Sequence, residues 1–409
     1  MANVSSSNGL EKRPKLRFPG FDEPYRSTQL GDIASLVNRT DPKSNAPIMM
    51  LSAGNGFIMQ SEKYSRDNAG QSLKKYILLK QGELAYNHGA SKAKQFGCCY
   101  ELTEPEARIP YVYHCFKIND HEYTPYIALA LNNTKMDKQL KRLVSSSVRM
   151  DGLLNISFED YMSVTLHLPS SNEQKRIADF LQKIDERIVA QEKLLASLKK
   201  YKRGLLREIF AKLSERCEKR NLKEVSVLFA DGDWIESKDQ ASGGIRLIQT
   251  GNVGFGVYLD KSQNAKYISE ATFHRLNCLE IYDGDILISR LPEPAGRACL
   301  LPKSTERRIT AVDCTVIRTD TSVIDRNYLL QFLCSEQYLK TVNSFLAGGT
   351  RQRISRKNLE GIEVPYPSID KQRYYGRLLC TVDAHISNAE QRLSCLSRLR
   401  CFMLQQLFI

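Results

Sequence analysis

The 409-residue chain lacks the sequence features of several large protein classes. No apolar run approaches the roughly 18 residues of a membrane-spanning helix. The first 20 residues contain Lys12, Arg13, Lys15 and Arg17 but no apolar stretch behind them, which argues against a secretory signal. These absences predict a cytoplasmic protein.

The 11 cysteines are scattered and include no Cys-x-x-Cys pair. A zinc site needs paired thiolates or histidines at short spacing, because one turn of chain must present two ligands. The pattern therefore predicts reduced, mostly buried thiols and no structural metal.

Motifs for nucleotide, cofactor and methyl-transfer chemistry are also missing. There is no GKS or GKT phosphate loop, no glycine fingerprint between a strand and a helix, and no Asn-Pro-Pro-Tyr type motif. The glycine-rich segments 53–56 and 251–256 lie among strand-like residues, which favours turns. The nearest approach to a nuclease cluster is Asp231 with Glu236 and Lys238, which could hold a divalent cation. A solvated turn near Trp234 is the favoured interpretation, and we expect no catalytic residue.

The net charge of +13 comes from 59 Lys and Arg against 46 Asp and Glu. Such a charge attracts polyanions, and nucleic acid is the commonest of these in a cytoplasm. Solubility or acidic protein partners would also explain it.

One segment occurs twice. Residues 169–210 align without a gap onto residues 367–408 at an offset of 198, with 11 of 42 positions identical, where roughly 2 or 3 are expected for unrelated stretches. Two helical copies alternating with two larger, divergent blocks indicate one kind of task done twice, with two specificities.

Both copies predict a long helix. Apolar residues recur at alternating spacings of four and three from Ile177 to Ile209 and from Tyr375 to Leu407, the pattern of a coiled coil. This stripe of apolar residues, the seam of the coil, is interrupted by a charged residue at the same place in both copies, at Lys202 and Arg400. Because the second helix returns toward the first block, the two should pair antiparallel as a spacer roughly 60 Å long.

The two large blocks are related but more divergent. Segment 77–87 matches segment 279–289, each as an apolar strand, a turn at Gly82 or Gly284 followed by an acid, and a second strand. Helical residues such as 328–344 then indicate an α/β or α+β domain in each block, with the two domains joined by two antiparallel coiled-coil helices in a pseudo-two-fold repeat. The predicted division is a basic tail at 1–20, globular domains at 21–170 and 213–368, and helices at 171–212 and 369–409.

Polar residues suited to DNA contacts gather at predicted loop tips. Arg, Asn and Gln can pair with base edges, and Lys, Thr and Ser with phosphates, although a solvated surface charge is an equal alternative at each position. Lys138, Lys141 and Arg142 form one such group. The candidate DNA-binding residues are Tyr86, Asn87, Lys92, Lys94, Arg149, Arg246, Thr250, Asn252, Arg290, Arg297, Arg351 and Arg353.

The repeated segments carry a family resemblance. The succession of a variable block, LPSSNEQKRIADFLQKIDERI with its coil, a second variable block and VPYPSIDKQRYYGRLLCTVDAHI with its coil resembles the specificity subunit of a type I restriction-modification system. PKLRFPGF, GELAYN and GDILISR support it. The second copy departs from the pattern at residues 371–375, which read KQRYY.

The resemblance implies that each block is a target recognition domain reading one half of a bipartite DNA site. It also implies that the coil sets the gap, which is the number of unread base pairs between the two halves. The blocks differ, so the site should be asymmetric. It further implies two methyltransferase subunits carrying S-adenosylmethionine and motor-nuclease subunits using ATP and Mg, while this chain is non-catalytic and binds no cofactor. The implied subunit-interface residues are Gln174, Lys175, Ile177, Leu181, Ile184, Gln372, Arg373, Leu379 and Val382. A metal-dependent nuclease and a coiled-coil scaffold with protein-binding end domains remain as alternatives.

Overall fold

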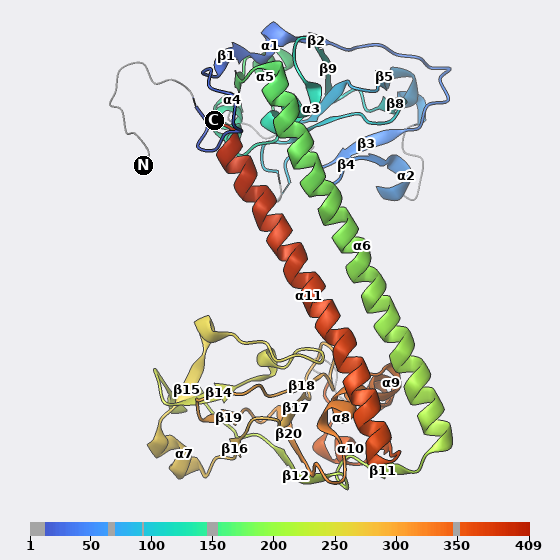
Figure 1. Cartoon of the computed structure of the whole chain (residues 1–409), viewed down its shortest axis with the longest axis vertical. Helices are drawn as coiled ribbons and strands as arrows, with labels where there is room; N and C mark the ends of the chain where they lie inside the picture. Colours follow the sequence, from blue (N-terminus) through green and yellow to red (C-terminus); the bar gives the residue numbers. More distant parts are fainter. Residues whose placement is uncertain (1–12, 64–69, 92–93, 145–153, 347–351) are drawn as a thin grey trace. The chain divides into compact units, whose positions relative to one another are not determined.

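The computed structural model describes residues 13–63, 70–91, 94–144, 154–346 and 352–409. The chain divides into two compact units: unit 1 comprises Met1–Ala190 and Leu393–Ile409, and unit 2 comprises Gln191–Arg392. The long helices α6 (Ser171–Arg216) and α11 (Ile369–Leu407) each contribute residues to both units (Figure 1). Helix α6 runs four residues beyond its predicted end, because Leu213 still packs in the core of unit 2.

Unit 1 is built around a four-stranded antiparallel sheet in the order β2-β9-β6-β7. Three further strand pairs, β1-β10, β3-β4 and β5-β8, surround it. The strands are β1 (Arg26–Gln29), β2 (Ala34–Leu36), β3 (Met49–Ser52), β4 (Gly56–Met59), β5 (Ile77–Lys80), β6 (Leu84–Asn87), β7 (Cys98–Glu101), β8 (Glu106–Ile109), β9 (His114–Ile118) and β10 (Thr165–Leu168). The helices before α6 are α1 (Leu30–Ile33), α2 (Gln60–Lys63), η1 (Gly70–Lys75), α3 (Thr124–Leu131), α4 (Asp137–Leu143) and α5 (Phe158–Met162).

Unit 2 contains a four-stranded sheet in the order β12-β20-β17-β18 and a five-stranded sheet in the order β13-β15-β14-β19-β16. Its strands are β11 (Lys219–Asn221), β12 (Ser226–Asp231), β13 (Gln240–Ala241), β14 (Ile245–Ile248), β15 (Lys266–Ile268), β16 (Glu280–Ile281), β17 (Ile286–Ser289), β18 (Ala298–Leu300), β19 (Arg308–Thr310), β20 (Cys314–Thr319) and β21 (Glu363–Pro365). Its helices before α11 are η2 (Ser237–Asp239), η3 (Thr250–Asn252), η4 (Ser262–Asn264), α7 (Glu270–Leu276), α8 (Arg326–Leu333), α9 (Glu336–Ser344) and α10 (Arg356–Glu360).

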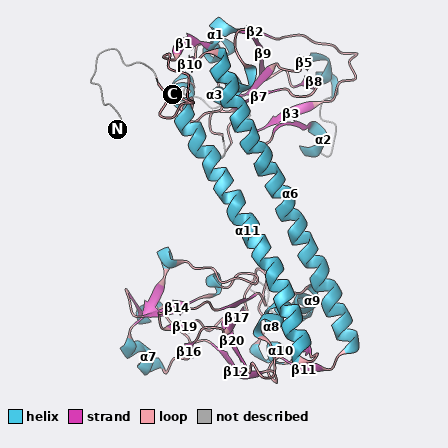
Figure 2. Ribbon diagram, viewed as in Figure 1, coloured by secondary structure: helices cyan, strands magenta, loops and turns pink. Residues whose placement is uncertain are grey.

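The four-stranded sheets show that the blocks are duplicated as well as the helices. In chain order, β2, β6, β7 and β9 correspond to β12, β17, β18 and β20, and the two sheets have the same strand order. The antiparallel strand pair β1-β10 of unit 1 corresponds to the antiparallel pair β11-β21 of unit 2. Both units mix strands with helices, as predicted (Figure 2). They differ in what surrounds the shared sheet, because the five-stranded sheet belongs to unit 2.

The predicted strand-turn-strand segments are present, but their strands do not pair with each other. Strand β5 pairs with β8, whereas β6 pairs with β7 and β9. Gly82 and its equivalent Gly284 have positive φ, which favours glycine. The acid after each, Glu83 or Asp285, accepts a hydrogen bond at 2.8 Å from the amide three residues earlier. Each carboxylate also pairs with an arginine from elsewhere in its unit, which explains why a buried acid follows each glycine.

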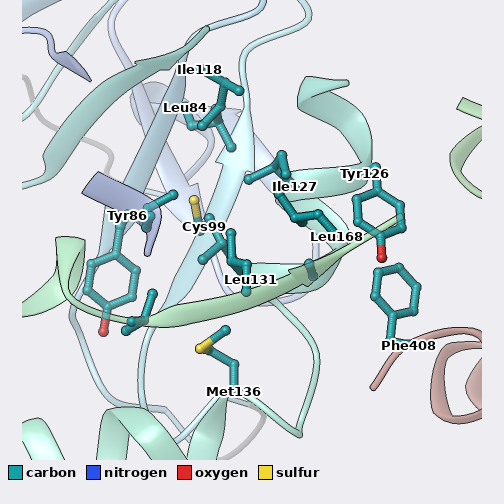
Figure 3. Packing of buried hydrophobic residues seen from close by; sticks show 14 of the residues in the cluster. Leu84, Tyr86, Cys99, Ile118, Tyr126, Ile127, Leu131, Met136, Leu168 and Phe408 are labelled. Atoms are coloured by element: carbon teal, nitrogen blue, oxygen red, sulfur yellow. The ribbon is translucent and has the colours of Figure 1, made fainter. Parts of the chain in front are cut away.

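The end of α11 completes the core of unit 1. The ring of Phe408 stacks on Tyr126 of α3 at a centroid distance of 4.9 Å, in the same buried cluster as Leu168 and Leu131 (Figure 3). The equivalent residue of α6, Phe210, packs against Tyr328 of α8 in unit 2 at 5.5 Å. Residues 198 positions apart therefore have the same role in the two units.

The seam of α6 and α11 follows the predicted spacing, and the described side chains along it are buried or half-buried. The charged residue that interrupts the seam in each helix forms an ion pair with the other helix. Arg400 pairs with Asp185 in unit 1, and Lys202 pairs with Asp383 in unit 2. Asp383 lies 198 residues after Asp185, so the two pairs are equivalent under the repeat. Pairing of an early residue of one helix with a late residue of the other confirms the antiparallel arrangement within each unit.

The N-terminal segment was expected to be a basic tail, but its described part, from residue 13, docks onto unit 1. Arg17 makes two hydrogen bonds, at 2.9 and 2.7 Å, to the fully buried carboxylate of Glu173 in the first turn of α6. The amide of Leu16 donates to the carbonyl of Gln406 at 3.1 Å. Position 371, which is equivalent to 173, is an exposed lysine. The departure of the second copy at Lys371 thus coincides with the absence of this ion pair.

The cysteines are free thiols, and seven of the eleven are buried. Burial raises the pKa of the Cys98, Cys278 and Cys314 thiols to about 11. They are protonated at neutral pH and pack as small apolar side chains, which confirms the prediction of mostly buried thiols.

Candidate nucleic-acid interface

Arg297, immediately before β18, holds two loops of unit 2 together. Its guanidinium donates hydrogen bonds to the carbonyls of Val253 (2.7 Å) and Thr250 (2.9 Å) in one loop, and of Leu291 (2.7 Å) and Pro294 (3.0 Å) in another. Burial lowers the pKa of the guanidinium. Because four of its five N–H donors are engaged, Arg297 supports the loops and is not free to contact DNA as predicted. Thr250 contributes its carbonyl to this arrangement and is half-buried.

Arg290 has a similar supporting role. It is 4% exposed, donates to the carbonyl of Val312 at 2.7 Å, and lies 3.4 Å from the carboxylate of Asp231. Asp231 also accepts a hydrogen bond from the Thr315 hydroxyl at 2.8 Å. The structure therefore gives no support to the predicted DNA contact of Arg290, because its guanidinium faces the interior.

The residues of the nuclease hypothesis are paired internally. Glu236 forms an ion pair with Lys238 at 2.8 Å and accepts a hydrogen bond from the Trp234 indole at 3.3 Å. The cation lowers the pKa of the Glu236 carboxyl, and Asp231 is held by Arg290. Within the described ranges, no group of three His, Cys, Asp or Glu side chains is arranged to hold a metal ion. This geometry gives the nuclease hypothesis no support.

Two further predicted contacts in unit 2 are also largely buried. Arg246 on β14 pairs with Asp260 and, at 3.1 Å, with Glu306. Asn252 at the end of η3 donates to the carbonyl of Leu259 at 3.0 Å and accepts from a backbone amide in its own turn. Both side chains stabilise the domain itself and are not available to read DNA.

The predicted contacts of unit 1 have the same character. Tyr86 stacks on Tyr161 at a centroid distance of 3.8 Å, and its hydroxyl donates to a backbone carbonyl at 2.6 Å. Asn87 accepts a hydrogen bond in the turn that follows β6. Lys94 donates to the carbonyl of Asn132 at 2.6 Å, and burial lowers its pKa. These three side chains order the end of the four-stranded sheet.

Among the predicted DNA contacts that the structure describes, Arg353 is the one that is exposed. Its side chain is 58% exposed and lies 3.6 Å from Asp313, so it can reach an external partner. Lys92, Arg149 and Arg351 fall outside the described residues.

Exposed cations gather on α4. Lys138, Lys141 and Arg142 are exposed and, at spacings of three and four residues, share one helical face, whereas Met136 and Leu140 are buried. The sequence indicated these cations but placed them at a loop tip. Their position on a short helix gives them a fixed spacing, which suits contact with successive phosphates.

The predicted subunit-interface residues divide into two groups. Lys175 and Arg373, one residue after the repeated glutamines, are exposed. The other seven are buried in the protein's own core and are not accessible to another chain: Gln174, Ile177, Leu181, Ile184, Gln372, Leu379 and Val382.

The repeated glutamines Gln174 and Gln372 attach each long helix to its domain. The side-chain oxygen of Gln174 accepts from the amide of Tyr123 before α3, and that of Gln372 accepts from the amide of Asp325 before α8, both at 2.9 Å. Each side-chain nitrogen donates to the carbonyl five residues earlier, at 3.0 and 2.9 Å. Their identity in both copies is the sequence signal for this shared role.

The duplicated sheets, helices and glutamine contacts can be compared with known proteins. The family model for the type I restriction modification DNA specificity domain matches residues 24–200 and again residues 214–397. The chain belongs to this family. Its two matches cover the two target recognition domains, each with most of the long helix that follows it.

Two curated relatives come from Methanocaldococcus jannaschii. The type I restriction enzyme MjaVIII specificity subunit is 23% identical over 264 residues, which are 60% of this chain and 61% of that protein. The putative type I restriction enzyme MjaX specificity subunit is 21% identical over 65% of this chain and 63% of that protein. The chain thus aligns with a little over three fifths of the length of these relatives.

Solved structures show the same fold over nearly the whole chain. The type I restriction-modification system S subunit from M. genitalium is 16% identical, with a TM-score of 0.60 over 97% of this chain and 99% of that chain. A chain from a type I R-M system studied for complex assembly and conformational transition is 17% identical, with a TM-score of 0.53 over 96% and 99%. The predicted fold class is confirmed. In the part of the chain that the structure describes, no helix has the length and apolar character to cross a membrane.

Proposed function

We propose that this chain is the DNA sequence-specificity subunit of a type I restriction-modification complex. Each target recognition domain reads one half of a bipartite DNA site. The chain itself carries out no chemistry and binds no cofactor. It positions its partner subunits on the DNA in the cytoplasm.

The observation that carries this proposal is the repeated domain. The two units have the same four-stranded sheet in the same strand order, and the family model matches both. A second, five-stranded sheet and different loops distinguish unit 2 from unit 1. Two similar scaffolds with different surfaces suit two different half-sites, so the proposed site is asymmetric.

Exposed cations support DNA contacts in both units. In unit 1, Lys138, Lys141 and Arg142 would bind phosphates, a contact that fixes position without reading sequence. In unit 2, Arg353 would pair with a base edge or a phosphate, since a guanidinium can form two parallel hydrogen bonds. The net charge of +13 supports a long-range attraction to DNA.

The repeat also supports two equivalent sites for one kind of partner. Lys175 and Arg373 are exposed at equivalent positions near the start of α6 and of α11. We place a methyltransferase subunit at each, carrying S-adenosylmethionine. Motor-nuclease subunits using ATP and Mg would join the same complex. In this proposal the paired helices set the number of unread base pairs.

Adenine-methylation sequencing tests the proposal directly. The chain is co-expressed with its methyltransferase in a host that lacks adenine methylation. We expect methylation at a site with two different half-sequences and a constant gap, and none when either protein is omitted. A single contiguous site or no methylation would refute the proposal. DNA cleavage by the purified chain with Mg²⁺ or Mn²⁺ would instead favour the nuclease alternative.

A further inference from the structure

A row of exposed cations lies along the second half of α6, within unit 2. From Gln191 to Arg216 the helix carries eight Lys and Arg against three Glu, whereas from Ser171 to Ala190 the two signs of charge are equal in number. Four of these cations are exposed on the side of the helix away from the seam. We call them the basic stripe: Lys193, Lys200, Arg203 and Arg207.

The basic stripe has no acidic partner in the described part of the chain. None of its four side chains forms an ion pair there. Neighbours three or four residues away on the helix would supply such partners, but for the stripe these neighbours are small, apolar or basic. Arg203 has a like charge on each side, at Lys200 and at Arg207. Like charges at these spacings destabilise a helix, so the stripe carries an electrostatic cost that an anionic partner would remove.

The other lysines in this half of α6 are paired, as Lys202 is in the seam. Lys199 pairs with Glu390 of α11 at 2.7 Å, and Lys212 pairs with Glu208 at 2.6 Å. These acids are therefore committed to cations outside the stripe. The charge of the stripe stays uncompensated although acids are present on both long helices.

Arg207 has one acid of another element in its surroundings, Glu336 at the start of α9. The pKa of the Glu336 carboxyl is lowered mainly by its hydrogen bond to Lys340 and to a smaller extent by Arg207. The ion pair of Glu336 is with Lys340, at 2.7 Å. The guanidinium of Arg207 thus remains available to an external partner.

The stripe is not repeated in α11. The equivalent positions, 198 residues later, hold a single cation among four residues: Gln391, Arg398, Cys401 and Gln405. A surface for a partner that binds twice is expected in both copies, as Lys175 and Arg373 are. The stripe therefore suits a partner that is present once. The DNA duplex is the single-copy polyanion of the proposed complex.

The spacing of the stripe suits a phosphate backbone. Lys193 and Arg207 are 14 residues apart in the sequence, which is about 21 Å along the helix and the length of about six base pairs of DNA. The residues between the cations on this face are small, at Ala196, Ser197 and Gly204, so a bulky polymer can approach the helix closely. Because a phosphate occurs at every base pair, each cation can find an anion without matched acid positions on the partner.

We propose that the basic stripe of α6 binds phosphates of the unread gap. This inference rests on the proposed function. Helix α6 joins the two target recognition domains in the chain, as the gap joins their two half-sites in the DNA. The contact adds affinity without reading sequence, because phosphates are the same at every base pair.

The salt dependence of DNA binding tests the stripe. The chain is assembled with its methyltransferase, and a labelled duplex carrying the site defined by methylation sequencing is added at about 50 to 200 mM salt. Lys193→Gln with Lys200→Gln, the stripe variant, should lower the slope of log K against log salt by nearly 2, because each lost phosphate contact removes about 0.9. Substituting both arginines of the stripe as well should about double this effect.

The matched control is Lys199→Gln with Lys212→Gln. It removes the same net charge from the same helix, but from lysines that are already in ion pairs. Glutamine is a good helix former, so both double variants should keep α6 helical. The control should bind DNA with the salt slope of the wild-type chain.

Uncharged linkages locate the contact on the DNA. In a second duplex, methylphosphonates replace the phosphates of the gap. Binding of the wild-type complex should weaken about tenfold or more, whereas the complex of the stripe variant should lose much less affinity. Equal weakening of the two complexes would overturn the inference, since the gap phosphates would then have other partners.

The remaining outcomes separate the explanations. Equal salt slopes for the stripe variant, the control and the wild-type chain would refute the contact while leaving the proposed function intact. Weaker binding of the methyltransferase by the stripe variant, measured without DNA, would assign the stripe to an acidic protein surface and overturn the inference. Failure of every complex, the wild type included, to bind the duplex would instead refute the proposed function.

Discussion

Replacing Gln372 with alanine tests how the second long helix is attached to unit 2. The fully buried side chain accepts one hydrogen bond from the amide of Asp325 and donates one to the carbonyl of Pro367, both at 2.9 Å. Alanine leaves the half-buried amide of Asp325 and the buried carbonyl of Pro367 without these partners. At about 1–3 kcal/mol for each unsatisfied group, we expect unit 2 to lose about 2–6 kcal/mol of unfolding free energy.

The equivalent Gln174→Ala variant provides an internal comparison in unit 1. Gln174 makes the same two hydrogen bonds and a third, at 2.6 Å, to the carboxylate of Glu122. A hydrogen bond to a charged group contributes about 1.5–3 kcal/mol. Because Glu122 keeps its pairing with Arg26, we expect an additional loss near the lower figure, about 1.5 kcal/mol.

Amide hydrogen exchange and urea unfolding provide the measurements. Gln372→Ala should speed exchange at Asp325 and leave Tyr123 protected, and Gln174→Ala should do the reverse. The control is Lys371→Ala, an exposed neighbour that should change unfolding free energy by less than about 0.5 kcal/mol. Unchanged protection of Asp325 in Gln372→Ala, with stability equal to the control, would refute the attachment role.

Arg353→Ala should cost about 1–3 kcal/mol of DNA-binding free energy through the half-site read by unit 2, and an equal loss on all sequences, measured by competition binding, would make Arg353 a phosphate contact. Arg17→Ala should lower the unfolding free energy of unit 1 by about 3–5 kcal/mol in urea titrations, because it leaves the buried Glu173 carboxylate unpaired, and Arg17→Met with Glu173→Gln should recover part of that loss. Burial lowers the folded-state pKa of His114 below its ordinary 6.5. The contribution of His114 to the free energy of unfolding is therefore complete above pH 6.5 and is lost as pH falls toward the folded-state pKa. His114→Gln should flatten the pH dependence of the unfolding free energy, and an unchanged slope would contradict this assignment. Removing one heptad, about 10 Å, from each of α6 and α11 should shorten the unread gap by roughly 3 base pairs in methylation sequencing, and an unchanged gap would show that the helices do not set it.

The periodic and repeated features of this protein were predictable from the sequence. The offset of 198, the seam and the glycine turns reflect local rules: apolar spacing selects the helix face, and positive φ selects glycine. The structure confirms long helices in both copies and an antiparallel pairing at equivalent positions. The duplicated four-stranded sheet was visible only in part, because sheet order depends on strands far apart in the chain.

The roles of single polar residues were much less predictable. Arg246, Arg290 and Arg297 look like DNA contacts in the sequence, yet each is engaged inside its domain. Loops leave many carbonyls without partners in regular structure, and an arginine can satisfy several of them at once. Whether a loop arginine points inward or outward depends on those distant carbonyls, so local sequence does not decide it.

The two long helices with their matching seams and breaks could be predicted from local sequence, because periodicity and repetition are properties of neighbouring positions. The role of the residues at the breaks depends on tertiary contacts. It brings Asp185 to Arg400 and Asp383 to Lys202, and it buries Gln174 and Gln372 in their own domains. A charged or amide side chain takes its role from the partner that satisfies it, and these partners lie from about 50 to more than 200 residues away in the chain.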